Sequence, residues 1–206
     1  MEVARRLGAT VVQHPWDGFV AQKARALANV TTPWALVLDA DERLADGAAE
    51  AIARFVAAPF AAGARLRRAN RWLGHEIRYG RWGRDRPLRL VRCDAAKVAG
   101  DDPHDVLEVD GAVAVLDGLI VHDPYRSVGD HLARIGRYAD RHATSLHARG
   151  VKARFLDVAV RPPWHLVKAL LLQSGWRDGV PGLAVAIFGA VRVAGKWIAL
   201  WRLNRA

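Results

Sequence analysis

Two carboxylates one residue apart, Asp39 and Asp41, directly follow an apolar run that begins at Trp34. In an α/β sheet, ligands bind just beyond the carboxyl ends of the strands. Two carboxylates in that place could bind a divalent cation and bridge it to a diphosphate group. The alternative is a solvated acidic turn at the start of the next helix, because Asp and Glu stabilise helix N-termini. The Asp-x-Asp pattern alone leaves both interpretations open.

The elements that would position this pair alternate between helix and strand, which is typical of an α/β fold. A continuous apolar run such as 34–38 is typical of a strand inside a parallel sheet. In chain order we predict a helix that ends at Gly8, a strand over 9–13, a helix over 19–29, the strand over 34–38 and a helix over 46–58 capped by Asp46.

The next part of the chain is richer in predicted strands, two of which flank a loop rich in Gly, Arg and Trp. The dipeptide Asp110-Gly111 is a strong turn signal, so we predict a β-hairpin around it. The predicted elements are strands over 64–71 and 88–92, the hairpin of 106–109 with 112–116, a strand over 119–122 and a helix over 127–149 that ends at Gly150.

Composition narrows the possible function. The chain has 206 residues, one cysteine and a net charge of +10. A single cysteine excludes a disulfide framework within the chain and a Cys-rich zinc site. The basic residues are concentrated in 65–92 and 151–206, which favours anionic partners. No helix-turn-helix, zinc-finger or RNA-recognition signature accompanies them, so we expect no nucleic-acid partner.

The sequence also bears on where the protein works. Residues 1–10 lack the apolar core of a secretory signal, and we expect a cytoplasmic protein. Residues 151–206 are basic and carry four of the eight tryptophans, but their longest uncharged stretch, 179–191, is shorter than the roughly 18 apolar residues of a spanning helix. Trp and Leu beside Arg and Lys suit a helix in the lipid headgroup layer, so we predict a peripheral contact with the anionic inner face of the plasma membrane. The alternative is a pair of helices that pack on the rest of the domain or on another subunit.

Several motifs follow one another along nearly the whole chain. They are 2–9, 14–19 (His-Pro-Trp-Asp-Gly-Phe), 22–23 (Gln-Lys), 34–43, Asn70, 73–74 (Leu-Gly), 80–82 (Gly-Arg-Trp), Asp85, 88–90 (Leu-Arg-Leu), His122, 125–127 (Tyr-Arg-Ser), 161–164 (Arg-Pro-Pro-Trp) and 178–182. In this order they resemble a bacterial family 2 glycosyltransferase, and the similarity is greatest to the lipopolysaccharide-core β-1,4-glucosyltransferases.

The resemblance implies a GT-A fold, an α/β mixed sheet flanked by helices. It implies a glycosyltransferase domain over 1–126, with a donor half over 1–62 and an acceptor half over 63–126, followed by the helical region 127–206. It implies inverting transfer of a sugar from a nucleotide-diphospho-sugar to a lipopolysaccharide-core or other envelope glycolipid acceptor. Asp39 would contact the nucleotide or ribose, and Asp41 would bind Mg²⁺ or Mn²⁺ on the diphosphate. Arg86 and Arg89 could hold diphosphate or acceptor phosphate oxygens.

An inverting transfer also needs a general base for the acceptor hydroxyl. Asp85, just before the Leu-Arg-Leu segment, is the first candidate, and its alternative is a salt bridge to a neighbouring arginine. Asp105 is the second candidate; the subgroup has Glu there, and the shorter Asp moves the carboxylate back by roughly 1.5 Å. His104 or His122 could complete the metal shell through a ring nitrogen, and the alternative for each is a structural hydrogen bond.

The chain departs from the family at its N-terminus. Family members begin with a strand, a helix and a second strand that hold the nucleotide base, whereas this chain begins at what resembles the next helix. We therefore expect a sheet with an exposed or shortened edge. The alternative function is a catalytically impaired, truncated remnant that acts as a binding or scaffold protein.

Overall fold

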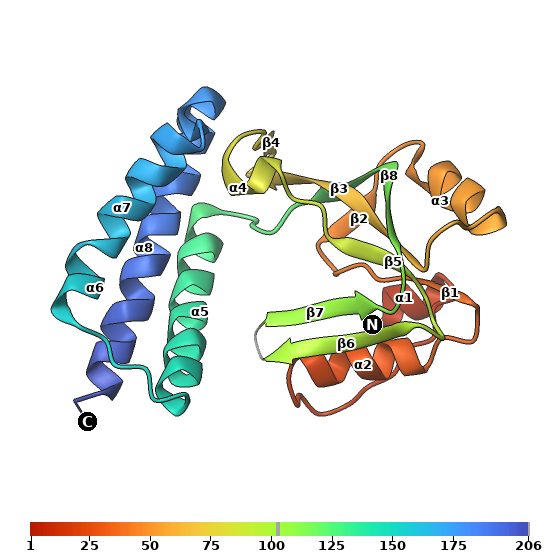
Figure 1. Ribbon diagram of the computed structural model, residues 1–206, viewed down its shortest axis with the longest axis horizontal. Helices are drawn as coiled ribbons and strands as arrows, with labels where there is room; N and C mark the ends of the chain where they lie inside the picture. Colours follow the sequence, from red (N-terminus) through yellow and green to blue (C-terminus); the bar gives the residue numbers. More distant parts are fainter. Residues whose placement is uncertain (102–103, 206) are drawn as a thin grey trace.

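The computed structural model describes residues 1–101 and 104–205, without the side chains of residues 101, 104 and 105. The described strands are confined to the first part of the chain: all of them lie before residue 123, interspersed with α1 to α4, and helices make up most of the chain after that point (Figure 1). The helices α5 to α8 form a separate layer beside the sheet, and the segment between β8 and α5 connects the two parts (Figure 1). The fold is therefore a mixed α/β part followed by a helical part.

The main sheet is mixed rather than parallel. Its strands run in the order β1 (Trp34–Leu36), β5 (Leu88–Arg92), β3 (Gly63–Trp72), β8 (Val113–His122) and β2 (Glu42–Leu44), and β4 (His75–Glu76) pairs with β3. Only β3 and β8 pair in parallel among the described strands. The prediction that 34–38 lies inside a parallel sheet is wrong, because β1 pairs antiparallel with β5 and stands at the edge.

The main core cluster is built from the central strands β5, β3 and β8. Leu66, Leu90 and Ile120 are fully buried, and Phe55 of α3 (Ala48–Ala57) packs against them. Burying each such side chain stabilises the fold by about 1.5–3 kcal/mol. Asp46 does not cap α3 as predicted; Gly47, in the left-handed conformation, occupies the N-cap and makes no side-chain bond.

The predicted hairpin around Asp110-Gly111 is wrong. β7 (His104–Val109) pairs with β6 (Ala96–Asp101) in a separate two-stranded sheet, whereas β8 pairs with β3 and β2. The dipeptide instead carries the chain from one sheet to the other, with the Asp110 N–H bonded to the Ala95 carbonyl at 2.8 Å and Gly111 at φ +120°. Its sequence marks a turn correctly, but long-range pairing with β3 decides the partner of β8.

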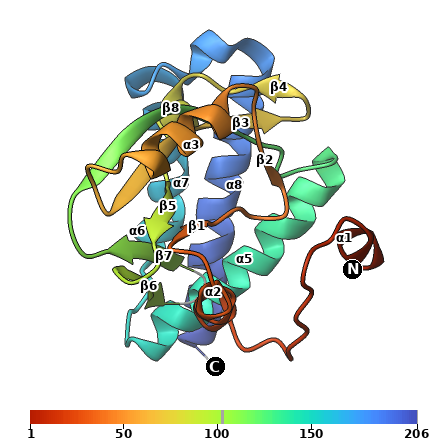
Figure 2. The same ribbon diagram turned by 90° about the vertical axis from the view of Figure 1, so that its right-hand side faces the viewer.

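The N-terminal segment is less regular than predicted. α1 (Glu2–Arg6) and α2 (Phe19–Ala28) match the predicted helices, and α2 packs against β6 and β7. The strand predicted over 9–13 is absent, because this stretch is irregular. It leads from α1 to α2, and the two helices lie apart (Figure 2).

The helical part is built on α5 (Val128–Ala148). The hydroxyl of Ser127 accepts the Asp130 N–H at 3.1 Å and caps its start. The remaining segments are α6 (Phe155–Ala159), α7 (Arg161–Val167), η1 (Lys168–Leu172), η2 (Gly175–Asp178) and α8 (Gly179–Leu203). α8 runs beside α5 and α7 (Figures 1 and 2). Trp197 and Leu200 of α8 are buried in a cluster with Ala143 of α5.

The helical part also carries the feature that indicates membrane association. Gly175–Leu203 is long and apolar enough to cross a membrane, and 17% of its most apolar window is buried in the protein. The alternative that the tail helices pack on the rest of the protein is correct for the buried side of α8, which lies against α5.

Candidate functional site

The acidic loop crosses the sheet from one edge to the other. β1 and β2 are the two ends of the strand order, and residues 37–41 join them. The Val37 N–H bonds to the Arg89 carbonyl at 2.8 Å, and the Asp41 carbonyl accepts the Asp123 N–H at 3.0 Å. The backbone therefore fixes both ends of the loop to strands far away in the sequence, and the side chains of Asp39 and Asp41 are held between them.

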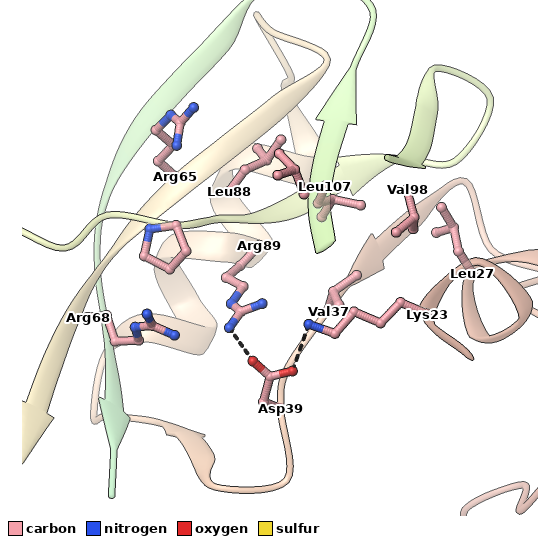
Figure 3. Close-up of a pocket in the computed structure, with 12 residues that line it drawn as sticks. Lys23, Leu27, Val37, Asp39, Arg65, Arg68, Leu88, Arg89, Val98 and Leu107 are labelled. Carbon is pink, nitrogen blue, oxygen red and sulfur yellow. Dashed lines mark hydrogen bonds and ion pairs between the residues drawn. The ribbon is translucent and has the colours of Figure 1, made fainter. Parts of the chain in front are cut away.

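Asp39 is engaged by cations of the protein itself. Its carboxylate lies 2.9 Å from Lys23 Nζ and 2.6 Å from Arg89 Nη2 (Figure 3). Burial opposes the charged form of Asp39, but Arg89 and Lys23 outweigh it and hold the pKa of this carboxyl below its ordinary value. Asp39 is therefore a charged residue whose contacts already include two cations.

Glu42 is the buried centre of the ion-pair network and was not predicted as a site residue. Its side chain has 0% exposure, and one oxygen lies 2.5 Å from Arg89 Nη2 and 2.6 Å from Arg68 Nη1. The other oxygen accepts the Asp39 N–H at 3.1 Å. A sequence signal for this role exists. Glu42 is the third carboxylate of the Asp-x-Asp-Glu run, and residues 65–92 carry a surplus of arginines that could pair with it.

Asp41 faces the largest described cleft, about 970 Å³ in volume. Its Oδ1 lies 3.6 Å from His122 Nε2, and its Oδ2 lies 3.9 Å from an Arg134 nitrogen. The interaction with His122 is the main cause of the lowered pKa of Asp41. The cleft is lined by Trp16, Phe19, Gln22, Lys23, Asp39, Ala40, Asp41, Glu42, Arg43, Arg68, His122, Asp123, Tyr125, Arg126, Arg134 and Tyr138.

The hydrogen bonds around His122 fix the form of its ring. Nδ1 lies 2.6 Å from the side-chain oxygen of Asn70, whose amide nitrogen donates to the Trp82 carbonyl and to Asp85. Nδ1 must therefore donate, and a neutral ring presents the lone pair of Nε2 toward Asp41. The lone pair of Nε2 and the Asp41 carboxylate therefore face each other at 3.6 Å, a separation at which both could be ligands of one cation.

These residues fit a divalent cation held mainly by substrate. No group of three His, Cys, Asp or Glu side chains that could hold a metal occurs among the described residues. Asp41 would supply a carboxylate ligand and His122 a ring nitrogen, and phosphate oxygens and water would supply the rest; Mg²⁺ is commonly bound by one or two carboxylates together with phosphate and water oxygens. His104, the other predicted ligand, lies in β7, but its side chain is outside the described part of the chain.

Asp85 lies in a neighbouring cavity rather than in the Asp41 cleft. Its Oδ2 accepts from Arg68 at 2.5 and 2.9 Å and from Asn70 at 3.2 Å, so the predicted alternative of a salt bridge is present. Arg68 reaches Glu42 with its other terminal nitrogen and lines both cavities. One guanidinium therefore links the acidic loop to the carboxylate predicted as the base.

The remaining predicted residues lie elsewhere. Arg89 contacts Asp39 and Glu42 and is buried, which gives its charge a partner within the protein. Arg86 is exposed and lines neither of these cavities. Asp105 belongs to β7, and its side chain lies outside the described residues, as does that of His104.

Comparison with known proteins relates the whole site-bearing region to glycosyltransferases. No protein-family model matches the chain. The chain is 26% identical over 180 residues to the lipopolysaccharide core biosynthesis glycosyltransferase LpsC of Rhizobium meliloti. The aligned region covers 86% of this chain and 67% of LpsC. The chain is 24% identical over 210 residues to uncharacterized glycosyltransferases of Rickettsia typhi and Rickettsia prowazekii, covering 92% of this chain and 69% of each relative.

Proposed function

We propose that this chain, which its homologues mark as a bacterial glycosyltransferase, transfers a sugar from a nucleotide-diphospho-sugar to a lipopolysaccharide-core or related envelope glycolipid. The observation that carries the proposal is the pair of cavities joined by Arg68. One holds Asp41, the carboxylate of the Asp-x-Asp motif that has no close cationic partner, and the other holds the second carboxylate, Asp85.

The Asp41 cleft is the proposed donor site. Asp41 and His122 would hold Mg²⁺ or Mn²⁺, which neutralises charge on the departing diphosphate when bound. Arg134, on the rim of the same cleft, adds a cation that can bond a phosphate oxygen. Asp39 would act mainly through Lys23 and Arg89, holding the loop in place.

The cavity with Asp85 is the proposed acceptor site. In an inverting transfer the acceptor hydroxyl attacks in line with the departing diphosphate and gives its proton to a base. The hydrogen bonds of Asp85 converge on Oδ2, so Oδ1 is the oxygen to take that proton. Arg68 holds this carboxylate in its orientation until the acceptor arrives.

We propose that the protein works at the inner face of the plasma membrane as a peripheral protein. Four apolar side chains in one short stretch, Leu171, Leu172, Trp176 and Val180, are 65%, 65%, 62% and 78% exposed. An exposed apolar patch of this kind marks an interaction surface, and nearby cations would meet anionic lipid headgroups.

Donor turnover tests the proposal. The rate of transfer, or of slow hydrolysis of nucleotide-diphospho-sugars, should require a divalent cation and fall when EDTA removes it. Asp41→Asn should lower this rate about 100-fold or more, equivalent to about 3 kcal/mol of transition-state stabilisation. Asp117→Asn is a matched control, because Asp117 is exposed on β8.

Two results would count against this function. A rate that is indifferent to EDTA and unchanged in Asp41→Asn would remove the metal-assisted donor site. Tight binding of nucleotide diphosphate with Mn²⁺ but no turnover with any donor would favour the alternative of a binding or scaffold protein.

A further inference from the structure

The cavity that holds Asp85 is about 420 Å³ in volume and lies where the sheet part meets the helical part. One wall comes from the segment between β4 and the end of α4 (Gly80–Gly83), and the opposite wall comes from α7, η1, η2 and α8. The two walls are joined by contacts such as the Gly80 N–H to the Gln173 carbonyl at 2.9 Å. The cavity is thus built by residues almost one hundred positions apart.

Cations in this cavity outnumber the carboxylates free to pair with them. Arg81 from α4 and Arg192 from α8 line it, and neither forms an ion pair within the described part of the chain. The two carboxylates of the lining are already engaged. Asp85 bonds to Arg68, and Asp178 accepts the backbone N–H groups of Arg78 and Tyr79 at 3.1 and 2.9 Å.

The titratable groups of the cavity respond to this positive field. Burial lowers the pKa of His165, and the charges of Arg192 and Arg81 are among the causes that lower it further. Burial likewise lowers the pKa of His131 to about 4, and Arg192 contributes. Both rings are therefore neutral at pH 7, and each can exchange hydrogen bonds with a polar ligand. An anion entering the cavity would lower the electrostatic energy of the whole group.

An aromatic wall runs along the same cavity. The rings of Trp82 and Tyr125 are stacked with centroids 6.3 Å apart, and Tyr125 stacks on His131 at 3.6 Å. Phe188 of α8 continues the wall at 4.4 Å from His131. Ligand sites commonly combine such apolar faces with a few convergent polar groups. Here the faces suit the C–H side of a sugar ring, and the two arginines suit a phosphate.

We propose that this cavity is a subsite for a phosphate group carried by the acceptor, bound between Arg81 and Arg192. The inference rests on the proposed function, because it gives the acceptor site its substrate class: a phosphorylated saccharide or a phosphate-bearing lipid headgroup. Arginine suits this role because its planar guanidinium donates two parallel hydrogen bonds to phosphate oxygens.

Binding measurements on the full chain test the subsite directly. Isothermal titration is performed with glucose 6-phosphate, with dihexanoyl phosphatidylglycerol, with glucose and with inorganic phosphate. We expect at least one of the two organic phosphates to bind, and glucose to bind at least tenfold more weakly. Tighter binding of glucose 6-phosphate assigns the phosphate to a saccharide, and tighter binding of the lipid assigns it to a headgroup; either supports the subsite.

Variants place the binding in this cavity. Arg81→Gln and Arg192→Gln should each weaken binding of the organic phosphate about tenfold, equivalent to 1.4 kcal/mol. Arg192→Lys should retain part of the affinity because it keeps the charge. The control is Arg54→Gln, an exposed arginine on α3 on the far side of the sheet from the helices (Figure 1). Thermal unfolding of each variant verifies that the protein remains folded.

Three outcomes would overturn the inference: no binding of either organic phosphate, affinity unchanged in the double variant Arg81→Gln/Arg192→Gln, or inorganic phosphate binding as tightly as both organic phosphates. Failure of the proposed function is recognised separately, by the absence of metal-dependent donor turnover in the wild-type protein. Normal donor turnover without phosphate binding refutes the subsite alone.

Discussion

The buried carboxylate of Glu42 pairs with both Arg68 and Arg89. Asp85 and Asp39 also contact these arginines, so replacing Glu42 with glutamine leaves the network with one positive charge in excess and with little change in shape. The side chain is 0% exposed, and Arg89 is only 8% exposed, so water cannot take over the lost role. Removing one partner of a buried ion pair costs about 3–5 kcal/mol when the remaining charge is left uncompensated, and the second carboxylate beside each arginine places the expected cost at the lower end of that range. We expect Glu42→Gln to lower the free energy of unfolding by this amount.

Urea unfolding followed by circular dichroism gives the free energy of unfolding by linear extrapolation. The matched control is Glu76→Gln, because Glu76 also contacts an arginine, Arg67, at 2.6 Å, but with 30% and 49% of the two side chains exposed. Exposed pairs contribute about 0–1 kcal/mol. If Glu42→Gln and Glu76→Gln destabilise the protein equally, by less than about 1 kcal/mol, the acidic loop is not held by a buried network and our account of it is wrong.

Two further predictions concern the helical part and its contact with the sheet. His131 has a folded-state pKa of about 4 against an ordinary value of 6.5, so the unfolded chain takes up its proton first and stability is lost as pH falls from 6.5 toward 4. The loss should be roughly 3 kcal/mol in wild type and absent in His131→Asn, measured by urea unfolding at several pH values; an equal loss in both would refute it. Gly83→Ala should destabilise the protein by several kcal/mol, because a Cβ there would lie 1.8 Å from the Arg78 carbonyl oxygen. Gly136→Ala, in open space on α5, should instead stabilise it by about 0.5–1 kcal/mol, and thermal unfolding of the two variants would contradict this if they behave alike.

Local sequence signals correctly predicted elements such as β5 and α5, whose bounds depend on neighbouring residues. The strand over 88–92 is found with the same bounds, and the helix over 127–149 differs by one residue at each end. Ser127 caps that helix through its own side chain, an interaction that spans three residues. The hairpin prediction failed because β8 pairs in parallel with a strand about fifty residues earlier, and no local pattern encodes that choice.

The same distinction holds for the candidate site. The Asp-x-Asp motif directed attention to the correct loop, and the Asp41 cleft lies there. The loop is held, however, by ion pairs that join Glu42 to Arg68 and Arg89, residues 26 and 47 positions away. Which arginines of a basic segment turn inward depends on strand pairing, so the sequence could indicate surplus charge there but could not assign its partners.

The two aspartates of the motif therefore differ in ways that their shared pattern conceals. Asp39 lies against Lys23 and Arg89, and its charge is already balanced within the protein. Asp41 lies 3.6 Å from His122 Nε2 and 3.9 Å from an Arg134 nitrogen, both beyond a normal hydrogen bond. A carboxylate without a close partner is the one that gains most from an incoming cation, since the attraction rises as the separation falls. The turn at residues 40–41, closed by the Glu42 N–H bond to the Asp39 carbonyl at 2.9 Å, thus separates the carboxylate that pairs with the protein's own cations from the one that we propose binds the metal.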